Sequence, residues 1–267
     1  MPESHRIKPG SKVKLAAIDP DGKELHADRA AAETEFAQLR EELAELQHLL
    51  YADGRRKVLI VFQAMDCGGK DGTIRHVFRG VNPQGVRVSS FKAPTAEELS
   101  RDFLWRIHRE VPGKGMIRIF NRSHYEDVLV VRVENLVPEP VWRGRYDQIN
   151  QFEQLLHESG TLILKFYLHI SKKEQKKRLE DRLSNPHKRW KFEMQDLVKR
   201  AQWDEYQIAY EEMLASCSTP HAPWYVIPSD QKWYRNLAVT RAIVEAMRKL
   251  ELRFPPAPDI PPDLKVE

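Results

Sequence analysis

The segment 58–73 joins an apolar run to glycines, a lysine and two aspartates in an order suited to binding phosphate. Its sequence, VLIVFQAMDCGGKDGT, predicts a buried strand, a loop, and a helix that begins near Lys70. Glycines let backbone N–H groups approach oxyanions, and the helix N-terminus adds partial positive charge. The Lys70 ammonium would then lie among the transferring phosphates. The predicted phosphate-binding residues here are Cys67, Gly68, Gly69, Lys70, Asp71, Gly72 and Thr73.

This loop departs from the pattern G-x-x-x-x-G-K-[ST] at two positions. Ala64 stands in place of the first glycine, and Asp71 stands in place of the hydroxyl residue that binds magnesium. The alternative is an ordinary strand-to-helix turn with an exposed lysine. We favour the phosphate loop because Asp66 and Lys70 bracket it directly after an all-apolar strand. Cys67 is interpreted as a small buried residue rather than a nucleophile.

A second polar cluster, Asn121–Asp127, follows the predicted strand 116–120. In P-loop enzymes a neighbouring strand often ends in a carboxylate that holds Mg²⁺, but Asn121 is neutral. The nearest carboxylates are Glu126 and Asp127. The spacing Ser123-x-x-Glu126 predicts a capping box, which gives Glu126 a structural role. Asp127 is therefore the predicted metal ligand of this cluster, although it could instead serve only the helix dipole.

Arg122 stands where that strand ends, beside the predicted phosphate site. A guanidinium there can bind two phosphate oxygens at once, and the alternative is a surface salt bridge. His124, one turn further on, is interpreted as a packed or capping residue.

Residues 171–192 carry nine Lys or Arg against three Asp or Glu, so this stretch holds a charge of +6 within a chain of net charge +4. Arg178 and Arg182 are four residues apart and share a helix face. A solvated charged helix is one explanation. A nucleic-acid surface is another, but no reader motif or base-stacking pattern accompanies the charge. We favour a lid that closes over phosphates, with Lys188 and Arg189 as further contacts and Arg75 across from them.

Composition limits the class of protein. Of 267 residues 41% are hydrophobic and two are cysteines, which predicts a sizeable core in a reducing compartment. The N-terminus has no apolar signal segment, and the longest purely apolar run, 58–62, is far too short to span a membrane. We expect a cytoplasmic protein without a membrane partner.

Strand and helix patterns alternate along the chain, which predicts an α/β fold with a five-stranded parallel sheet and helices on both faces. An extended arm is expected at 1–26, a single domain at 27–252, and a Pro-rich tail at 253–267. The predicted strands are 58–62, 86–91, 116–120, 161–169 and 224–227. The predicted helices are 27–51, 70–78, 96–110, one opening at Ser123, 146–158, one capped by Ser171, 193–216 and 230–250.

Five blocks of the sequence resemble the second family of polyphosphate kinases over roughly residues 10–250. They are AMDCGGKDGTI, GVNPQGVRVSSFKAPT, DFLWRIH, IFNRSHYEDVLVVRV and RLEDRLSNPHKRWKF. The block with His124 is similar to the subgroup that accepts both AMP and ADP. The resemblance implies a three-layer, thymidylate-kinase-like P-loop core with a helical basic lid at about 171–192. It also implies Mg²⁺, for which Mn²⁺ would substitute, and self-association into a homo-oligomer.

On matching positions, the resemblance implies Asp66, Lys70 and Asp127 as catalytic or metal residues and Arg122 as a phosphate contact. It also implies Arg178 and Arg182 as lid arginines, joined by Lys188. The expected reaction moves a phosphoryl group from inorganic polyphosphate to AMP and ADP, giving ADP and ATP. The alternatives are an ATP-dependent nucleoside monophosphate kinase of the same fold and a non-catalytic module that binds polyanions.

Overall fold

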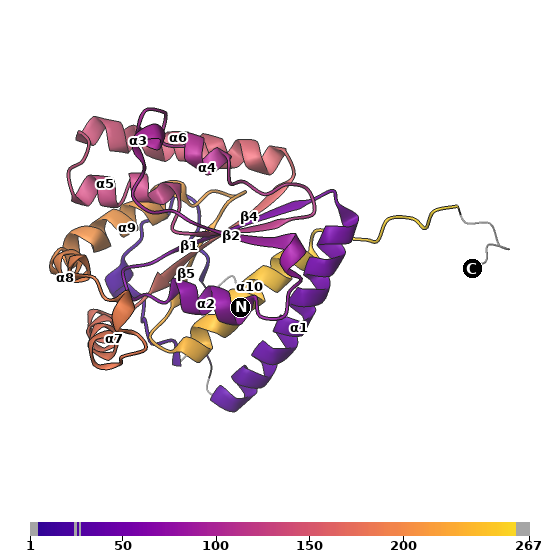
Figure 1. The fold of residues 1–267 in the computed structure, drawn as a ribbon, viewed down its shortest axis with the longest axis horizontal. Coiled ribbons are helices and arrows are strands. Elements are labelled where there is room, and N and C mark those ends of the chain that lie inside the picture. Colours follow the sequence, from indigo (N-terminus) through magenta and orange to yellow (C-terminus); the bar gives the residue numbers. More distant parts are fainter. Residues whose placement is uncertain (1–4, 24–25, 27, 260–267) are drawn as a thin grey trace.

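The computed structural model describes residues 5–23, 26 and 28–259, and its centre is a five-stranded sheet in which all strands are parallel (Figure 1). The strand order is β2-β3-β1-β4-β5. The strands are β1 Lys57–Gln63, β2 Val86–Ser90, β3 Ile117–Asn121, β4 Thr161–His169 and β5 Trp224–Pro228. The predicted sheet is confirmed. Because β1 lies between β3 and β4, the residues that follow it emerge in the middle of the carboxyl edge, where parallel sheets bind their ligands.

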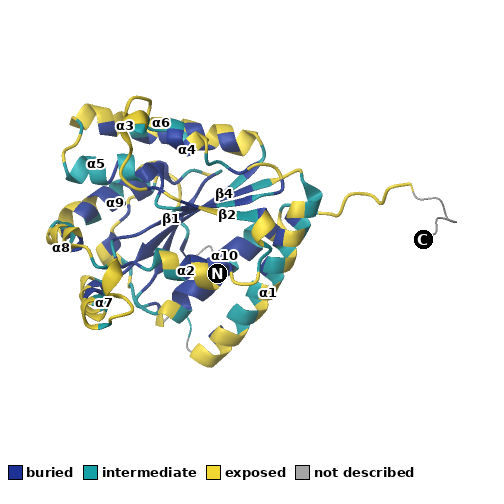
Figure 2. Ribbon diagram, viewed as in Figure 1, coloured by how far each residue is buried: buried dark blue, intermediate teal, exposed yellow. Residues whose placement is uncertain are grey.

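Every residue of β1 after Lys57 is buried, because helices cover both faces of the sheet (Figure 2). Val58, Ile60 and Phe62 point into one hydrophobic core. Leu59 and Val61 alternate with them and point into the other core. Helices α1, α2 and α10 cover the first face. Helices α4, α5, α6 and α9 lie over the second.

The helices have the following bounds. They are α1 Arg29–Asp53, α2 Lys70–Val77, α3 Ala96–Leu99, α4 Trp105–His108, α5 Val130–Val133, α6 Glu139–Glu158, α7 Lys172–Ser184, α8 Met194–Ala201, α9 Trp203–Cys217 and α10 Lys232–Arg248.

Two helices that the sequence pattern predicts as continuous are each divided. The predicted helix 96–110 breaks into α3 and α4, because the Asp102 carboxylate accepts a hydrogen bond from the N–H of Leu104 and opens a new turn there. The predicted helix 193–216 breaks at Gln202. That break lets Trp203 pack into the core while α8 turns away from the sheet (Figure 1). The lid region therefore consists of α7, a short 3₁₀ turn at Arg189–Lys191, and α8.

The N-terminal arm packs against the body of the protein. Its backbone at Ile7 donates to the carbonyl of Trp224, and His5 Nε2 lies 2.7 Å from the hydroxyl of Tyr234. From Pro255 the tail runs outward as an exposed chain through residue 259 (Figure 1), and the rest of it lies outside the described residues. None of the helices described has both the length and the apolar character that crossing a bilayer requires.

Candidate active site

The loop between β1 and α2 folds tightly around two glycines. The N–H of Gly68 donates to the carbonyl of Met65 at 2.9 Å, and a side chain at position 68 would collide with Ala64 and with that carbonyl. Gly69 caps the N-terminus of α2 with φ = 102°, a conformation that favours glycine. Cys67 also takes a positive φ of 62°. The sequence therefore builds a turn that ends at the positive end of α2, as a phosphate loop requires.

Lys70 places its amine inside this turn. Its Nζ donates to the carbonyl of Ala64 at 3.2 Å, and no carboxylate in the described part of the chain forms an ion pair with it. Burial lowers the pKa of this amine, and the nearby charge of Arg122 lowers it further. The charge of Asp66 opposes this shift but does not form an ion pair with the amine, so this partly desolvated cation is well suited to bind an anionic ligand.

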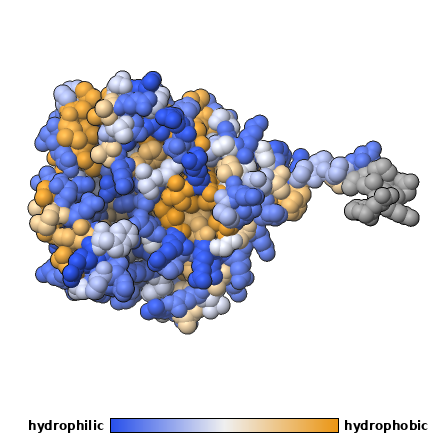
Figure 3. Space-filling model, in the orientation of Figure 1, coloured by the Kyte–Doolittle hydropathy of each residue, from blue (hydrophilic) through white to orange (hydrophobic). Residues whose placement is uncertain are grey.

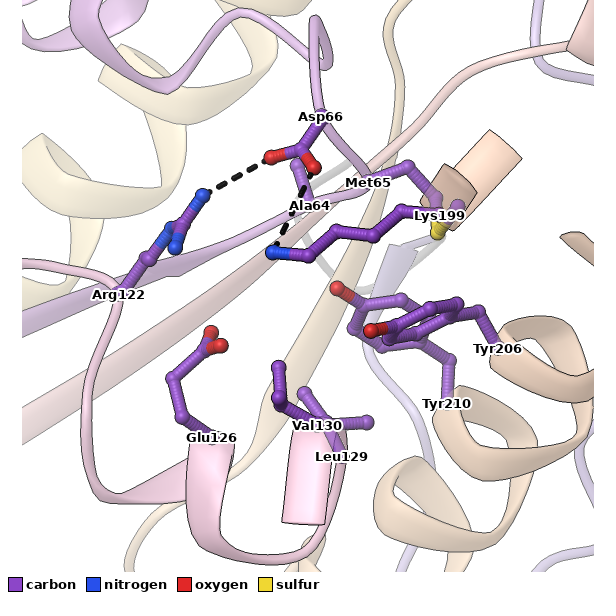
Figure 4. A pocket seen from close by; sticks show the side chains of 10 residues that line it. All are labelled: Ala64, Met65, Asp66, Arg122, Glu126, Leu129, Val130, Lys199, Tyr206 and Tyr210. Atoms are coloured by element: carbon purple, nitrogen blue, oxygen red, sulfur yellow. Dashed lines mark hydrogen bonds and ion pairs between the residues drawn. The ribbon is translucent and has the colours of Figure 1, made fainter. Parts of the chain in front are cut away.

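Asp66 lies at the centre of a group of cations (Figure 4). Its carboxylate accepts a hydrogen bond from Arg122 Nη2 at 2.9 Å and lies 3.9 Å from Lys199 Nζ. Burial alone would raise the pKa of Asp66, but the charges of Lys70, Arg122, Lys199 and Arg182 outweigh it and lower the pKa. Asp66 is therefore ionised at neutral pH. Lys199 could not be predicted from the sequence, because it lies on α8, 133 positions from Asp66 along the chain, and nothing local marks it.

Arg122 reaches Asp66 through an unusual backbone conformation. It has φ = 62° directly after β3, and its N–H donates to the carbonyl of Phe62 on β1. A non-glycine residue in this region is strained, and strain of this kind concentrates at functional sites. The structure thus brings the predicted residues Asp66, Lys70 and Arg122 together.

The two adjacent carboxylates Glu126 and Asp127 point in different directions. Glu126 accepts a hydrogen bond from the Gln63 side chain at 2.8 Å and faces the same small cavity as Asp66 (Figure 4). The predicted capping box is wrong, because the Ser123 hydroxyl accepts from the N–H of Tyr125 and Glu126 does not cap the turn. The Glu126 carboxylate therefore lines the cavity.

Asp127 turns toward two arginines instead. Its carboxylate lies 3.1 Å from Arg145 Nη1 and 4.0 Å from Arg106 Nη2. Burial raises the pKa of Asp127 to about 6, against the opposing effect of Arg145 and Arg106. In this arrangement both oxygens of Asp127 face cations of the protein rather than the cavity.

Two other polar residues, one in α2 and one in its first turn, form hydrogen bonds to other residues of the protein. Asp71 accepts a hydrogen bond from the Asn121 side chain at 2.7 Å, which ties α2 to the end of β3. The Thr73 hydroxyl donates to the carbonyl of Gly69 inside α2 and is buried. Cys67 is also buried, and burial raises the pKa of its thiol to about 11, so it is protonated at neutral pH. The interpretation of Cys67 as a small packed residue agrees with this environment.

The two predicted lid arginines have different partners: Arg178 ties α7 to the phosphate loop, and Arg182 ties α7 to α8. Arg178 donates to the carbonyls of Cys67 and Gly68 at 3.0 and 3.1 Å and to that of Ser229 at 2.6 Å. Arg182 binds Asp196 of α8 at 3.1 Å. Its charge nevertheless lowers the pKa of Asp66, which places Arg182 near the site.

The other predicted basic contacts lie at the surface. Lys188 forms an ion pair with Asp181 at 2.6 Å, and Arg189 donates to the carbonyl of Leu183. Arg75 is exposed on α2. None of these three side chains forms an ion pair with Asp66.

Helix α9 supplies a wall of the cavity that sequence patterns did not reveal. Tyr206 and Tyr210 are one turn apart and direct their hydroxyl groups toward the space between Asp66 and Glu126 (Figure 4). Aromatic residues at this spacing ordinarily indicate core packing. Leu129 and Val130 complete the apolar side of the cavity.

The donor set fits a hard divalent cation. Asp66 is an ionised carboxylate, and Glu126 faces the same cavity. In the described part of the chain no three His, Cys, Asp or Glu side chains converge as a metal cage. Mg²⁺ ordinarily uses one or two carboxylates together with water and substrate phosphates, so two suffice.

The parallel sheet, the glycine loop with its half-buried lysine and the surrounding cations define a P-loop kinase fold. The chain matches the family model described as polyphosphate kinase 2 over residues 26–255. It therefore belongs to the polyphosphate kinase 2 family, as the sequence blocks indicated.

Relatives with published names agree. The chain is 55% identical to the AMP/ADP-polyphosphate phosphotransferase of Meiothermus ruber over 95% of both chains. It is 44% identical to the ADP-polyphosphate phosphotransferase of Rhodopseudomonas palustris, over 94% of this chain and 91% of that one. The crystal structure of polyphosphate kinase 2 from Arthrobacter aurescens TC1 superimposes with a TM-score of 0.92 at 43% identity, covering 99% of this chain and 93% of that one.

Proposed function

We propose that this protein transfers a phosphoryl group from inorganic polyphosphate to AMP and to ADP, giving ADP and ATP in a reversible reaction. The observation that carries the proposal is the half-buried amine of Lys70 at the N-terminus of α2, which forms no ion pair among the described residues, with Arg122 and Lys199 on the neighbouring Asp66. The name of the Meiothermus ruber relative supports both acceptors. We infer a cytoplasmic enzyme, and self-association stays a prediction.

The proposed reaction needs no general acid or base from the protein. The terminal phosphate of a nucleotide is already ionised near neutral pH, so its oxygen can attack the donor phosphorus without a general base. Catalysis then consists of aligning two polyanions and neutralising the charge between them. In this proposal Lys70 and the α2 N-terminus hold the transferring phosphate, while Arg122 binds its neighbour. Arg178 keeps the loop in shape, and Arg182 adds charge from the lid.

Mg²⁺, or Mn²⁺ in its place, would neutralise phosphate oxygens and fix their orientation when bound. Asp66 is the first proposed ligand. Asp127, the second ligand predicted from the sequence, would reach a metal only after its pair with Arg145 opened. Glu126 needs no such rearrangement, because it already faces the cavity.

An assay matrix tests the proposed function. Purified protein is offered polyphosphate or ATP as donor and AMP or ADP as acceptor, with Mg²⁺ or with EDTA, and the nucleotide products are separated. We expect ADP and ATP from polyphosphate in the presence of Mg²⁺ and none with EDTA. Transfer to AMP from ATP alone would favour an ordinary nucleotide kinase. Polyphosphate binding without turnover would favour a polyanion-binding module.

The second metal ligand can be identified with two adjacent, chemically matched variants. We expect Glu126→Gln to raise the Mg²⁺ concentration for half-maximal rate by about tenfold or more, because it removes a carboxylate from the cavity. Asp127→Asn should raise it less, because that carboxylate faces Arg145 and Arg106. Magnesium titrations of the initial rate measure both. The reverse order would show that Asp127 is the ligand and that its arginine pair opens during turnover.

A further inference from the structure

A second cavity opens at the amino edge of the sheet, where β4 extends beyond its neighbour β5. Strand β4 pairs with β1 from Thr161 onward, but it pairs with β5 only from Lys165 onward. Pro220 and Pro223 lie in the segment that leads into β5, and proline has no backbone N–H with which to extend the pairing. Residues 161–164 therefore border a cavity of about 410 Å³ rather than a neighbouring strand.

This cavity is separate from the candidate active site. Among the described residues, none lines both this cavity and the one beside Asp66. Lys249 and Leu250, which directly follow α10, line it. The tail that begins after them leaves the molecule on the side away from the lid helices α7 and α8 (Figure 1). Small-molecule sites have volumes of roughly 300–1,000 Å³, so the cavity has room for a small organic ligand.

One part of the lining is apolar and comes from two strands and a helix. It consists of Leu162 and Leu164 of β4, Tyr225 of β5, and Ala242 and Ala246 of α10. The two alanines are four residues apart and share a helix face, where larger side chains would fill the space. The face of the molecule in Figure 3 carries several separate apolar patches among hydrophilic residues. Apolar surface alone therefore does not mark a binding site on this protein.

Two buried polar atoms in the lining distinguish this cavity. The Thr161 side chain is 2% exposed, and its hydroxyl has no hydrogen-bond partner among the described residues. The Nε2 atom of His221, in the segment before β5, is likewise buried without a partner in the described part of the chain. A buried polar atom without a partner destabilises the fold unless water or a ligand satisfies it. Both residues line the cavity, so one ligand there would satisfy both atoms.

The charged residues of the lining are mostly cations. Arg6, Arg56 and Lys249 line the cavity together with a single carboxylate, that of Glu245. Arg56 and Lys249 form no ion pair in the described part of the chain, although the arginine that precedes each of them in the sequence does. Arg6 donates to the carbonyl of Pro220 at 3.4 Å. The surplus of positive charge favours a ligand that carries an anionic group.

We propose that this cavity binds a small organic anion, with an apolar body on β4 and α10 and an anionic head group at Arg56 and Lys249. The Thr161 hydroxyl and the His221 imidazole bind its polar atoms. A carboxylate and a phosphate share the chemistry of the head group, and the test separates them. Because the ligand would join β4, β5 and α10, it should raise the thermal midpoint of the protein.

Ligands that differ in one feature at a time test this site on the wild-type protein. The fluorescent probe anilinonaphthalene sulfonate has an apolar body and an anionic head, and its binding is titrated with saturating ADP present to fill the nucleotide site. Octanoate and octyl phosphate then compete for the probe and differ from each other only in the head group. Octanol lacks the charge, and inorganic phosphate lacks the apolar body. Thermal unfolding with each ligand gives an independent measure of binding.

Three variants change the cavity, and one matched variant controls for loss of charge. Arg56→Met removes a cation, Thr161→Val removes only the hydroxyl, and Ala246→Phe fills the apolar part. Arg87→Met removes an exposed arginine of β2, which lies at the opposite edge of the sheet. The denaturant midpoint of Thr161→Val should be equal to or higher than that of the wild type, because the variant removes a buried hydroxyl that has no partner.

We expect the wild type to bind octanoate and octyl phosphate at least about tenfold more tightly than octanol or inorganic phosphate. The affinity for both anions should fall about fivefold in Arg56→Met, about threefold in Thr161→Val and about tenfold in Ala246→Phe, and stay within about twofold in Arg87→Met. The tighter of the two anions identifies the head group. The rate of phosphoryl transfer should stay within about twofold of the wild type in all four variants, since none of them touches the active site.

Three results would overturn the site. One is a wild type that binds neither octanoate nor octyl phosphate. Another is unchanged affinity in both Arg56→Met and Thr161→Val, which would place the probe elsewhere on the surface. The third is a change in the sedimentation mass of Ala246→Phe without ligand binding by the wild type, which would assign the cavity to a contact between copies of the chain. A wild type that binds these anions but transfers no phosphoryl group would refute the proposed function and support the site.

Discussion

Replacing Lys70 with alanine should lower the rate of phosphoryl transfer about 10²–10³-fold without unfolding the protein. The amine lies inside the turn of the loop, and among the described residues its one hydrogen bond goes to the carbonyl of Ala64. A phosphate bound at the N-terminus of α2 would gain from this charge most strongly in the transition state, when negative charge shifts between donor and acceptor. Its loss should therefore reduce kcat more than it raises KM.

The fold should tolerate this change because Lys70 forms no ion pair in the described part of the chain. Burial already lowers the pKa of the amine, which shows that its surroundings disfavour the charge. The thermal midpoint of Lys70→Ala is expected to equal or exceed that of the wild type. Turnover close to the wild-type rate would remove Lys70 from the mechanism. A large drop in the midpoint would instead mean that the amine supports the loop.

The second large effect concerns stability rather than chemistry, and it comes from a fully buried ion pair. Lys165 of β4 and Glu153 of α6 have no exposed surface, and their charged atoms lie 2.5 Å apart. Lys165 also donates to the hydroxyl of Tyr125 and the carbonyl of Cys217, both at 2.7 Å. Glu153 accepts from Tyr125 at 2.8 Å and lies 3.2 Å from His124 Nε2.

We expect Glu153→Gln to lower the free energy of unfolding by about 3–5 kcal/mol, because it leaves the Lys165 charge buried without a counter-ion. Lys165→Met should cost a similar amount by leaving the carboxylate unpaired. The double variant Glu153→Gln, Lys165→Met should recover part of the loss, since no charge then remains buried. Denaturant titrations of all four proteins at pH 7 measure the coupling. Additive losses in the double variant would argue against a coupled pair.

This network also bears on the site. His124 and Tyr125 lie in the turn between Arg122 and Glu126, and both are held by Glu153. Variants of the pair that still fold should therefore bind phosphate donors less well, because the turn that carries Arg122 and Glu126 loses its anchor. The prediction of a packed His124 is confirmed, since its ring is fully buried.

Much of the site was predictable from the sequence because its signals are local. The apolar run of β1, the glycines after it and Lys70 are consecutive residues, and together they specify a strand, a tight turn and a helix start. The capping box of Thr95 and Glu98 is another local feature, since both partners lie within one turn. The five-stranded parallel sheet follows from the alternation of such segments.

Local signals also misled where two partners compete for one side chain. The spacing of Ser123 and Glu126 suits a capping box, yet Glu126 binds Gln63, which is 63 residues away. Arg178 and Arg182 share a helix face as predicted, but the carbonyls that Arg178 binds belong to the loop and to the end of β5. Spacing shows which side chains lie together on one element, and it says nothing about what that element packs against.

The sequence by itself determined the chemistry of this protein: a strand, a glycine turn and a lysine that form an anion site, and a surplus of positive charge in the lid. Only the tertiary structure decided which charges face that site and which neutralise one another. It brought Lys199 to Asp66 and Arg235 to Gly69, and it turned Asp127 toward Arg145. The physical reason is that backbone turns and helix caps depend on neighbouring residues, whereas the partner of a charge depends on packing between elements that are distant in the chain.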